Sequence, residues 1–439
     1  MAHRQKKLPA GEHVAEILDL DHEGRGVARV NGKATFIADA LPGETVRFRY
    51  VRVSRDLDEG QCVAVEKASP DRVTPGCAHF GLCGGCSMQH LAPAQQIQFK
   101  QKQLLDQLQR IGKLVPEEIA APITGEVWGY RRRARLGAKF VPKKGGALVG
   151  FRERESSLLA TLESCQVLDP RVGLKLRALA GLIESLDLRR AVPQIEVACA
   201  DQVALVVRIL EAPAEADRER LAAFAAEHDV DLYLQTGGPD SIRPLGTARP
   251  LQYSPDGSAL SLRFEPTDFI QVNGSISQKT VNQALDWLDL QPGERVLELF
   301  CGLGNFSLPL ARRGAQVIAA EGEDGLVRRA RENAERNGLP IRFEKADLFK
   351  TEADVAWLQP AFDKVLLDPP RAGAKEILPV VAKRQPERIV YVSCHPGTLA
   401  RDAATLVHEH GYRLLRAGVM DMFPHTSHVE SMALFVRGR

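Results

Sequence analysis

Apolar residues in the C-terminal part of the chain follow two alternating periods. Short apolar runs such as "RVLELF" (295–300), "QVIAAE" (316–321) and "RIVYVSC" (388–394) have the length of buried strands. Between them lie stretches with helical spacing, such as "LVRRARENAERNG" (326–338). Strands that alternate with helices predict a doubly wound, mostly parallel, Rossmann-like α/β sheet over residues 266–439.

The N-terminal part has a different pattern. Residues 12–67 form short alternating runs separated by turn signals such as "HEGRG", "NGK" and "LPGE". This spacing predicts a small β-barrel of the OB type over residues 9–69. Residues 70–265 mix strands with helical stretches at 92–113 and 170–188, which predicts a mixed α+β central domain. The helix at 92–113 is expected to pack on the C-terminal domain.

Composition sets limits on this picture. The chain has 439 residues, 44% hydrophobic and 26% charged, with a formal net charge of +2. No stretch approaches the roughly 18 apolar residues of a membrane span. The basic start "MAHRQKKLPAGEH" has no apolar core behind it, which argues against a secretory signal. We therefore expect a cytoplasmic protein that does not bind a membrane. Nothing in the sequence implies an obligate protein partner, and we expect a monomer.

A glycine turn follows the first strand of the predicted C-terminal sheet. In "LELFCGLGNF", Glu298 lies near the strand end, and the glycines at 302 and 304 let the backbone approach a ligand closely. Glu321 ends the next strand, where a carboxylate can bind ribose hydroxyls. Asp347 ends the third strand and suits an adenine edge. The turn is shorter than the dinucleotide fingerprint, which favours S-adenosylmethionine over NAD.

Two later strands also end in reactive groups. In "LLDPPRAG", two prolines form a rigid elbow that presents Asp368, which could hold a base edge or position the cofactor. The next strand ends at Cys394, just before a predicted helix whose N-terminus favours a thiolate.

A thiolate at this position suits one kind of chemistry. Addition of the thiolate to carbon 6 of uracil makes carbon 5 nucleophilic, and a general base must later remove the proton from carbon 5. The segment "DMFPHTSHVESMALF" offers His425, His428 and Glu430 for that step. Glu430 begins an apolar strand, where a carboxylate is unexpected unless it is used.

The cysteines are unevenly distributed. Cys77, Cys83 and Cys86 lie within ten residues, and Cys165 far along the chain could be a fourth ligand. Four thiolates suit zinc or an iron–sulfur cluster. Zinc sites usually come as two CxxC pairs, so three clustered cysteines plus one distant cysteine favour a [4Fe-4S] cluster. For the other unassigned cysteines we expect packing roles: Cys62, Cys199 and Cys301.

Basic residues concentrate in "WGYRRRARLGAKFVPKKGG" (128–146) and along one strand of the predicted barrel. Such runs are commonly solvated faces. If the chain acts on RNA, phosphate contact is the better interpretation of the first run. For the barrel strand, a solvated face and a nucleic-acid-binding surface are equally good interpretations. The residues concerned are Arg131, Arg132, Arg133, Arg135, Lys139, Lys143 and Lys144, with Arg47, Arg49, Arg52 and Arg55 in the barrel.

Several segments together resemble the RNA uracil-5 methyltransferase family: "DFIQVN", "ELFCGLGNF", "LLDPPRAG", "VSCHPGTLARD" and "FPHTSHVESM". The resemblance implies that Cys394 is the nucleophile and Glu430 the base. It also places a set of residues around S-adenosylmethionine and the target base: Gln271, Phe300, Asn305, Glu321, Asp347 and Asp368. Two positions depart from the family pattern, since Glu298 stands where Asp is more usual and His395 where Asn is usual.

The resemblance extends into the N-terminal half. Some members of this family carry a [4Fe-4S] cluster with the spacing of Cys77, Cys83, Cys86 and Cys165, and the barrel resembles a TRAM domain, an RNA-binding module. The three parts together most resemble the members that methylate uracil 1939 of 23S rRNA. The resemblance therefore implies 23S rRNA as the partner, with the target uracil extruded to reach Cys394.

Rival interpretations differ in substrate or in class. The nearest alternative is an enzyme that methylates two sites of 23S rRNA. An enzyme that methylates a tRNA is another alternative, although relatives that act on tRNA usually lack the barrel and the cysteines. A non-catalytic iron–sulfur RNA-binding protein is a different class, and the presence of both Cys394 and Glu430 argues against it. A DNA methyltransferase that acts on an amino nitrogen needs no cysteine nucleophile, so "SCHP" argues against that function.

Overall fold

The computed structural model describes residues 8–350 and 354–438, so most of the basic start of the chain lies outside it. The chain divides into two units. The first is Met1–Gln103 with Phe423–His428, and the second is Leu104–Met422 with Val429–Arg439. Among the described residues, no helix is both long and apolar enough to cross a membrane.

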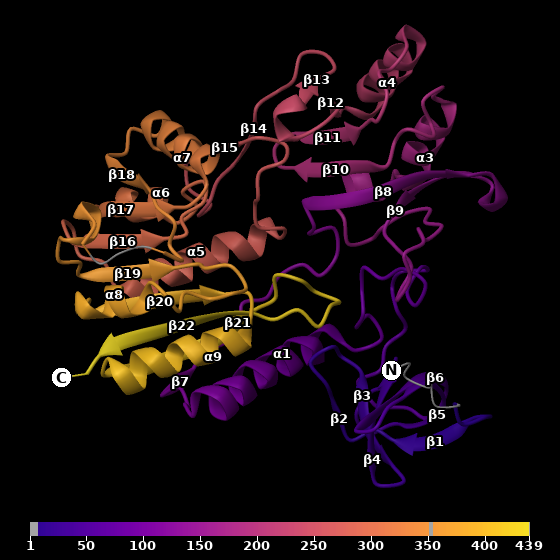
Figure 1. Cartoon of the computed structure of the whole chain (residues 1–439), viewed down its shortest axis with the longest axis horizontal. Coiled ribbons are helices and arrows are strands. Elements are labelled where there is room, and N and C mark those ends of the chain that lie inside the picture. The colour runs from indigo at the N-terminus through magenta and orange to yellow at the C-terminus, as the bar shows by residue number, and fades with distance from the viewer. Residues whose placement is uncertain (1–7, 351–353, 439) are drawn as a thin grey trace, which may run out of the picture. The chain divides into compact units, whose positions relative to one another are not determined.

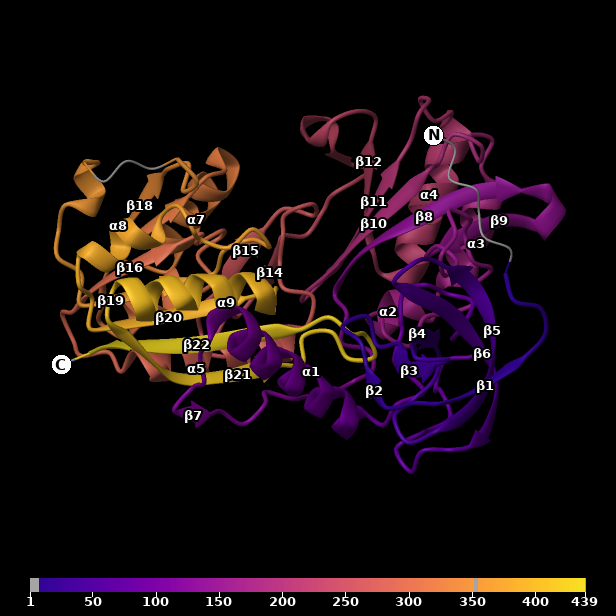
Figure 2. The same ribbon diagram turned by 60° about the horizontal axis from the view of Figure 1, so that its bottom comes forward.

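Short strands in the first unit form one sheet (Figure 2). They are β1 (His13–Glu16), β2 (Asp19–Leu20), β3 (Gly26–Val30), β4 (Lys33–Ala38), β5 (Thr45–Val53) and β6 (Leu57–Lys67), in the order β1-β5-β6-β4-β3-β2. Only residues 17 and 18 separate β1 from β2, so one bent segment pairs with β5 and then with β3 and closes the barrel. Val46 and Phe48 point into its core. The predicted small barrel is confirmed.

The first unit also contains a loop, residues 77–86, that carries three cysteines and is built from turns and bends. A segment from near the C-terminus joins this part of the chain. The backbone N–H groups of Ser87 and Met88 donate to the carbonyl oxygen of His425 at 3.0 and 2.9 Å. The side chain of Gln96 accepts from the His425 N–H at 2.8 Å. No local pattern predicts this association.

The predicted helix at 92–113 is present as α1 (Pro93–Gln107), which runs from the first unit into the second and continues as a π-helical turn, Leu108–Gly112. That turn packs against α9 (Pro396–Ala404). The carbonyl oxygen of Gly112 lies 3.0 Å from Nε2 of His408. The expected packing of the whole helix on the C-terminal domain stays a prediction, and the contact between the turn and α9 is consistent with it.

A central sheet forms the first part of the second unit. Its strands are β8 (Arg133–Val141), β9 (Gly146–Gly150), β10 (Gln194–Cys199), β11 (Val203–Arg208), β12 (Asp231–Gln235) and β13 (Arg243–Pro244), in the order β13-β12-β11-β10-β8-β9. Its helices are α2 (Pro170–Gly173), α3 (Leu176–Ser185) and α4 (Glu215–His228). Sequence reasoning found the region of α2 and α3 and missed α4. A separate pair, β14 (Leu251–Tyr253) and β15 (Leu262–Phe264), follows.

The C-terminal sheet has the order β18-β17-β16-β19-β20-β22-β21-β7 (Figure 1). Its strands are β16 (Arg295–Leu299), β17 (Gln316–Glu321), β18 (Ile341–Lys345), β19 (Lys364–Leu367), β20 (Arg388–Ser393), β21 (Tyr412–Met420), β22 (Glu430–Arg437) and the unpredicted β7 (Glu118–Ile119). The helices are α5 (Gly274–Leu288), α6 (Ser307–Arg312), α7 (Asp324–Arg336), α8 (Leu378–Lys383) and α9, which a π-helical turn (Thr405–Glu409) extends. The predicted doubly wound sheet is confirmed.

The order of these strands fixes where a ligand can bind. From β16 the chain moves outward through β17 to β18, and it then returns to β19 and continues in the opposite direction to β20. Right-handed crossovers therefore place α6 and α7 on one face of the sheet and α8 on the other. The reversal between β16 and β19 opens a crevice beyond their carboxyl ends, where α/β sheets bind ligands.

Candidate active site

The glycine turn after β16 has the conformation that a ligand-binding turn needs. Phe300, Gly302 and Gly304 have φ angles of 63°, 55° and 92°. A side chain at Gly302 would meet no atom within 4 Å, so the backbone here borders open space. This geometry suits close approach of a ligand.

Glu321 is fixed at the end of β17 by backbone donors. One carboxylate oxygen accepts the N–H of Gly302 at 3.0 Å. The other accepts the N–H groups of Gly322 and Glu323 at 2.7 and 3.1 Å. Glu321 is thereby held beside the glycine turn, where the sequence placed a ribose ligand.

Glu298 is buried inside the sheet rather than at its edge, with 1% of its surface exposed. The Ser307 hydroxyl donates to one of its carboxyl oxygens. Among the described residues, the other oxygen has no hydrogen-bond partner. Burial, with a smaller contribution from Asp368, raises the pKa of Glu298 to about 8, so the carboxyl group is a potential hydrogen-bond donor at neutral pH.

Three predicted reactive groups come together at adjoining strand ends. Asp368 directly follows β19, Cys394 directly follows β20, and Glu430 begins β22. Strand β20 pairs with β19 and β22, and Ser393 lies opposite Ser431 in the register, which brings Cys394 to the level of Glu430. The charge of Glu430 acts on both Asp368 and Cys394. The structure thus joins residues that are up to 62 positions apart (430 − 368).

The charges around Cys394 do not favour the thiolate that the sequence predicted. Burial first, and then the charges of Glu430 and Asp368, raise the pKa of Cys394 to about 11, whereas Arg371 lowers it. The sequence predicted that the N-terminus of α9 would favour the thiolate; the two carboxylates and burial outweigh it. Burial and Glu430 also raise the pKa of Asp368 to about 7.

His395, one of the two departures from the family pattern, has a defined structural role. Its Nδ1 accepts the backbone N–H of Thr398 at 3.2 Å and caps α9. Asn is a strong N-cap for the same reason, so His395 performs locally what an Asn would perform. The cap lies next to Cys394 and holds the strand-to-helix turn.

Gln271 and Asn305 both line a small cavity, of about 10 Å³, that Glu430 also lines. The hydroxyl of Tyr253 donates to the Asn305 side-chain oxygen at 3.2 Å. The Arg132 guanidinium lies 4.3 Å from the centre of the Tyr253 ring, and its Nε donates to the Gln271 carbonyl oxygen at 2.8 Å. Tyr253 was missed in the sequence, because no motif marks a tyrosine in a short strand as a neighbour of Asn305.

Two predicted cofactor residues lie farther out along the strand ends. Asp347 follows β18 and is exposed, and its side chain accepts the N–H of Phe349 at 3.1 Å. The rings of Phe300 and Phe349 lie 5.9 Å apart. The roles of Phe300 and Asp347 in binding a nucleoside stay predictions.

The basic segment only partly fits its predicted role. Arg133 donates to the carbonyl oxygens of Asp268 and Val197 and forms an ion pair with Glu196 at 3.2 Å. Arg132 is likewise directed inward by its contacts with Tyr253 and Gln271. These inward contacts do not support the interpretation of either residue as a phosphate contact. They support the interior because burial of an arginine requires nearby acceptors.

Other basic residues of the two segments remain at the surface. Arg135 and Lys139 are exposed on β8, although Arg135 pairs with Glu196 at 3.0 Å. In the barrel, Arg47 and Arg49 point outward from β5 and both pair with Glu12. These side chains are accessible to a phosphate that can compete with a carboxylate.

Cys77, Cys83, Cys86 and Cys165 are each half-buried, and the Gly85 N–H donates to Sγ of Cys83 at 3.4 Å. Among the described residues, no group of three or more His, Cys, Asp or Glu side chains is arranged to hold a metal ion. Cys199 and Cys301 are buried, as expected for packing residues, and Cys62 is half-buried in the barrel.

Comparisons with protein families match both halves of the chain. A family model described as tRNA (Uracil-5-)-methyltransferase matches residues 253–438. A TRAM domain model matches residues 14–58. The first therefore covers strands β16 to β22 of the C-terminal sheet, with Asp368, Cys394 and Glu430, and the second covers most of the barrel.

Individual proteins resemble the whole chain. It is 52% identical over 443 residues to the 23S rRNA (uracil(1939)-C(5))-methyltransferase RlmD of Alkalilimnicola ehrlichii, covering 100% of this chain and 99% of the relative. It is 51% identical over 443 residues to the protein of that name from Methylococcus capsulatus, with 100% of both covered. The solved Pyrococcus abyssi tRNA (uracil-54, C5)-methyltransferase in complex with S-adenosyl-L-homocysteine has a TM-score of 0.73 at 24% identity, covering 97% of this chain and 100% of its own, which shows a shared fold.

Proposed function

Because this chain belongs to the family of the 23S rRNA (uracil(1939)-C(5))-methyltransferases, we propose that it transfers a methyl group from S-adenosylmethionine to carbon 5 of a uracil in 23S rRNA. The relatives that match its whole length are named for uracil 1939, which makes that nucleotide the proposed target. One observation supports the chemistry most directly: a thiol and two carboxylates, Cys394, Asp368 and Glu430, meet at adjoining strand ends.

Cys394 is the proposed nucleophile. Its sulfur forms a bond to carbon 6 of the extruded uracil, and the negative charge then passes to carbon 5 and the neighbouring carbonyl oxygen. The thiol must first lose its proton, and its pKa of about 11 makes this step unfavourable in the protein alone. Bound S-adenosylmethionine supplies the methyl group and a positive sulfonium charge. Asp368 is close enough to influence the thiol and is a candidate acceptor for its proton.

Glu430 is the proposed base of the second half of the reaction. Carbon 5 would take the methyl group as the bond between that group and the sulfonium sulfur breaks, and S-adenosylhomocysteine would leave. The Glu430 carboxylate then removes the proton from carbon 5. The electron pair of that C–H bond forms the double bond between carbons 5 and 6, and the bond from carbon 6 to sulfur breaks. Cys394 leaves as the thiolate, so the enzyme is regenerated.

The residues at the glycine turn fit S-adenosylmethionine. Glu321 is proposed to bind the ribose hydroxyls, and Asp347 and Phe300 to face the nucleoside. Gln271, Asn305 and Asp368 are proposed to line the methionine end and the target base. Open space at Gly302, and a buried oxygen of Glu298 without a partner among the described residues, support a polar ligand at this turn.

We propose that Cys77, Cys83, Cys86 and Cys165 hold a [4Fe-4S] cluster with a structural or RNA-docking role. Four half-buried cysteines, and the amide of Gly85 directed at the sulfur of Cys83, suit thiolate ligation. None of the methyl-transfer steps uses the cluster. The cytoplasm is the proposed compartment, because it keeps such thiols reduced, and a monomer is the proposed state.

The proposed function is tested by mapping 5-methyluracil in RNA from a strain that lacks this protein. The expected result is loss of the modification at position 1939 of 23S rRNA and its return with the wild-type gene but not with Cys394→Ala. Loss from a tRNA, or from a second rRNA site as well, would favour the alternative substrates. Unchanged modification of all these RNAs would overturn the proposal.

A further inference from the structure

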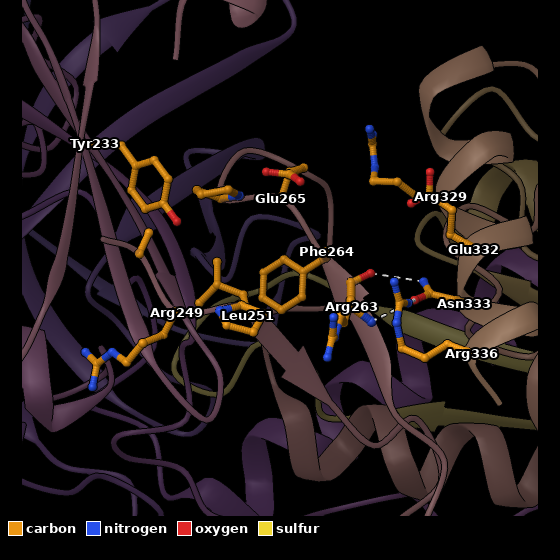
Figure 3. A pocket seen from close by; sticks show the side chains of 13 residues that line it. Tyr233, Arg249, Leu251, Arg263, Phe264, Glu265, Arg329, Glu332, Asn333 and Arg336 are labelled. Carbon is orange, nitrogen blue, oxygen red and sulfur yellow. Dashed lines mark hydrogen bonds between the residues drawn. The ribbon is translucent and has the colours of Figure 1, made fainter. Parts of the chain in front are cut away.

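A second cleft in the same unit lies outside the proposed active site (Figure 3). It has a volume of about 320 Å³ and is formed by β12, β14, β15 and one side of α7. None of its lining residues is among the proposed catalytic, cofactor or cluster residues. Its size is near the lower limit for sites that enclose a small molecule, and is sufficient for one nucleotide.

Four arginines line the cleft, and they differ in how they are paired. Arg249 forms ion pairs with Asp231 and Asp229. Arg329 forms an ion pair with Asp268 at 2.6 Å. Arg263 and Arg336 are exposed, and neither has a carboxylate partner among the described residues. These two cations are therefore available to an anion from outside the protein.

The two available arginines are held on a rigid frame. Asn333, with 1% of its surface exposed, accepts the Arg263 backbone N–H at 2.9 Å and donates to the Arg263 carbonyl oxygen at 3.0 Å. Arg336 donates to the same Asn333 side chain at 2.9 Å. One buried amide thus fixes the backbone of β15 against α7 and orients the Arg336 guanidinium, which reduces the ordering needed on binding.

The opposite wall is less charged. Tyr233 comes from β12, and in Figure 3 its hydroxyl points toward the cleft. Burial, with Asp231 and Glu265, raises the pKa of Tyr233, so its hydroxyl is neutral at physiological pH. Leu251 and Phe264 add an apolar surface between this wall and the arginines.

Two acids limit the kind of ligand. Glu265 and Glu332 also line the cleft, and Glu332 is paired with Arg328 at 2.9 Å. They disfavour a ligand with several phosphates, because a second anion would lie near a carboxylate. A carboxylate does suit the exocyclic amino group of a base.

We infer that this cleft binds one nucleotide of the substrate RNA, at a position other than the target uracil. Its phosphate lies between Arg263 and Arg336, and its base lies toward Tyr233 and Glu265. The inference rests on the proposed function, since it takes RNA to be the substrate. A contact of this kind would position the RNA while the chemistry takes place at Cys394.

The test uses the full-length protein and a fragment of 23S rRNA that contains the target. Arg263→Ala and Arg336→Ala should each raise the Kd for the fragment about three- to tenfold, and each should reduce the slope of log Kd against log salt by about 0.7. The loss should fall on KM for RNA rather than on kcat. Arg263→Lys should restore most of the salt slope, because it retains the charge.

Arg342→Ala is the matched control, since Arg342 is an exposed arginine of β18 outside the cleft that pairs with Glu344. It should bind the fragment as the wild type does. The inference is overturned if both cleft variants keep the wild-type Kd and salt slope, or if the control loses as much. Failure of the wild type to methylate any 23S rRNA fragment would instead contradict the proposed function.

Discussion

At the scale of single residues, the site is dominated by competition between neighbouring acids. Cys394, Asp368 and Glu430 lie so close that each negative charge disfavours the next, and burial adds to the effect. The thiol is therefore kept protonated in the protein alone. The Cys394 thiol can therefore be unreactive in the protein alone and still react with substrate. The positive sulfonium charge of bound S-adenosylmethionine would favour the thiolate and so lower the pKa of the thiol.

Replacement of Glu430 by Gln should trap the reaction halfway. The variant can still form the bond between Cys394 and carbon 6, but it lacks the carboxylate that removes the proton from carbon 5. A protein–RNA adduct should therefore persist on a denaturing gel. The double variant Cys394→Ala/Glu430→Gln is the control and should form none. An adduct of equal yield in the double variant would contradict the roles proposed for both residues.

Replacement of Asp368 by Asn should make Cys394 more reactive in the free protein. The Asp368 charge raises the pKa of the thiol, so its removal should lower that pKa from about 11. Below the pKa, each unit of decrease gives about ten times more thiolate. Alkylation of the Cys394 peptide by iodoacetamide, followed by mass spectrometry from pH 7 to 10, should shift to lower pH. Asp347→Asn is the control, and an equal shift there would argue against the specific contribution of Asp368.

At the scale of elements, the residues of the proposed chemistry lie at the ends of strands and the starts of helices. The turn from β20 into α9 holds Cys394, and the side chain of His395 caps the helix directly after it. The turn from β16 into α6 is built from residues with positive φ angles. Both turns place backbone N–H groups and reactive side chains at the same edge of the sheet.

His395→Ala should destabilise the protein by about 1 kcal/mol, because Thr398 loses the acceptor for its backbone N–H. His395→Asn should be close to neutral, since an Asn side chain can cap the helix in the same way. Urea unfolding of the three proteins measures the difference. Equal stability of the wild type and the Ala variant would show that the cap contributes little.

The cysteine loop should bind iron when the protein is purified without oxygen. About four irons per chain are expected if the loop and Cys165 complete a [4Fe-4S] cluster. Cys83→Ala should lose most of this iron, because one thiolate ligand is removed. Cys62→Ala is the control and should retain it, since Cys62 lies in the barrel. Stoichiometric zinc without iron would contradict the cluster.

At the scale of the whole molecule, the units do not follow the order of the chain. The segment Phe423–His428 belongs with the first unit, although the strands on either side of it, β21 and β22, belong to the second. The same hairpin thus presents Glu430 in one unit and contributes buried contacts to the other. The sequence predicts three domains, at residues 9–69, 70–265 and 266–439, and that division stays a prediction.

Removal of the barrel arginines should weaken RNA binding without abolishing catalysis. In a variant with Ala at 47, 49, 52 and 55, fewer counterions are released, so the salt dependence of Kd should flatten. The decrease should be smaller than for four free cations, because Arg47 and Arg49 already pair with Glu12. Filter binding at several salt concentrations measures this. An unchanged slope would show that this face of the barrel does not meet phosphate.

The sequence by itself determined most of the elements, although not α4 or β7, and it identified the candidate reactive residues. The periods of apolar positions specify the barrel and the doubly wound sheet, and Cys394, Asp368 and Glu430 stand at strand ends that the pattern locates. These features could be predicted because they depend on neighbours along the chain.

Only the tertiary structure decided what depends on residues distant in the sequence. The inward direction of Arg132 and Arg133, the raised pKa of Cys394 and the contribution of Tyr253 all result from groups that folding brings together. A charge run in a sequence does not reveal whether acceptors lie beneath it. A thiol before a helix likewise does not reveal whether carboxylates from other strands will face it, because pKa values are set by three-dimensional proximity and burial.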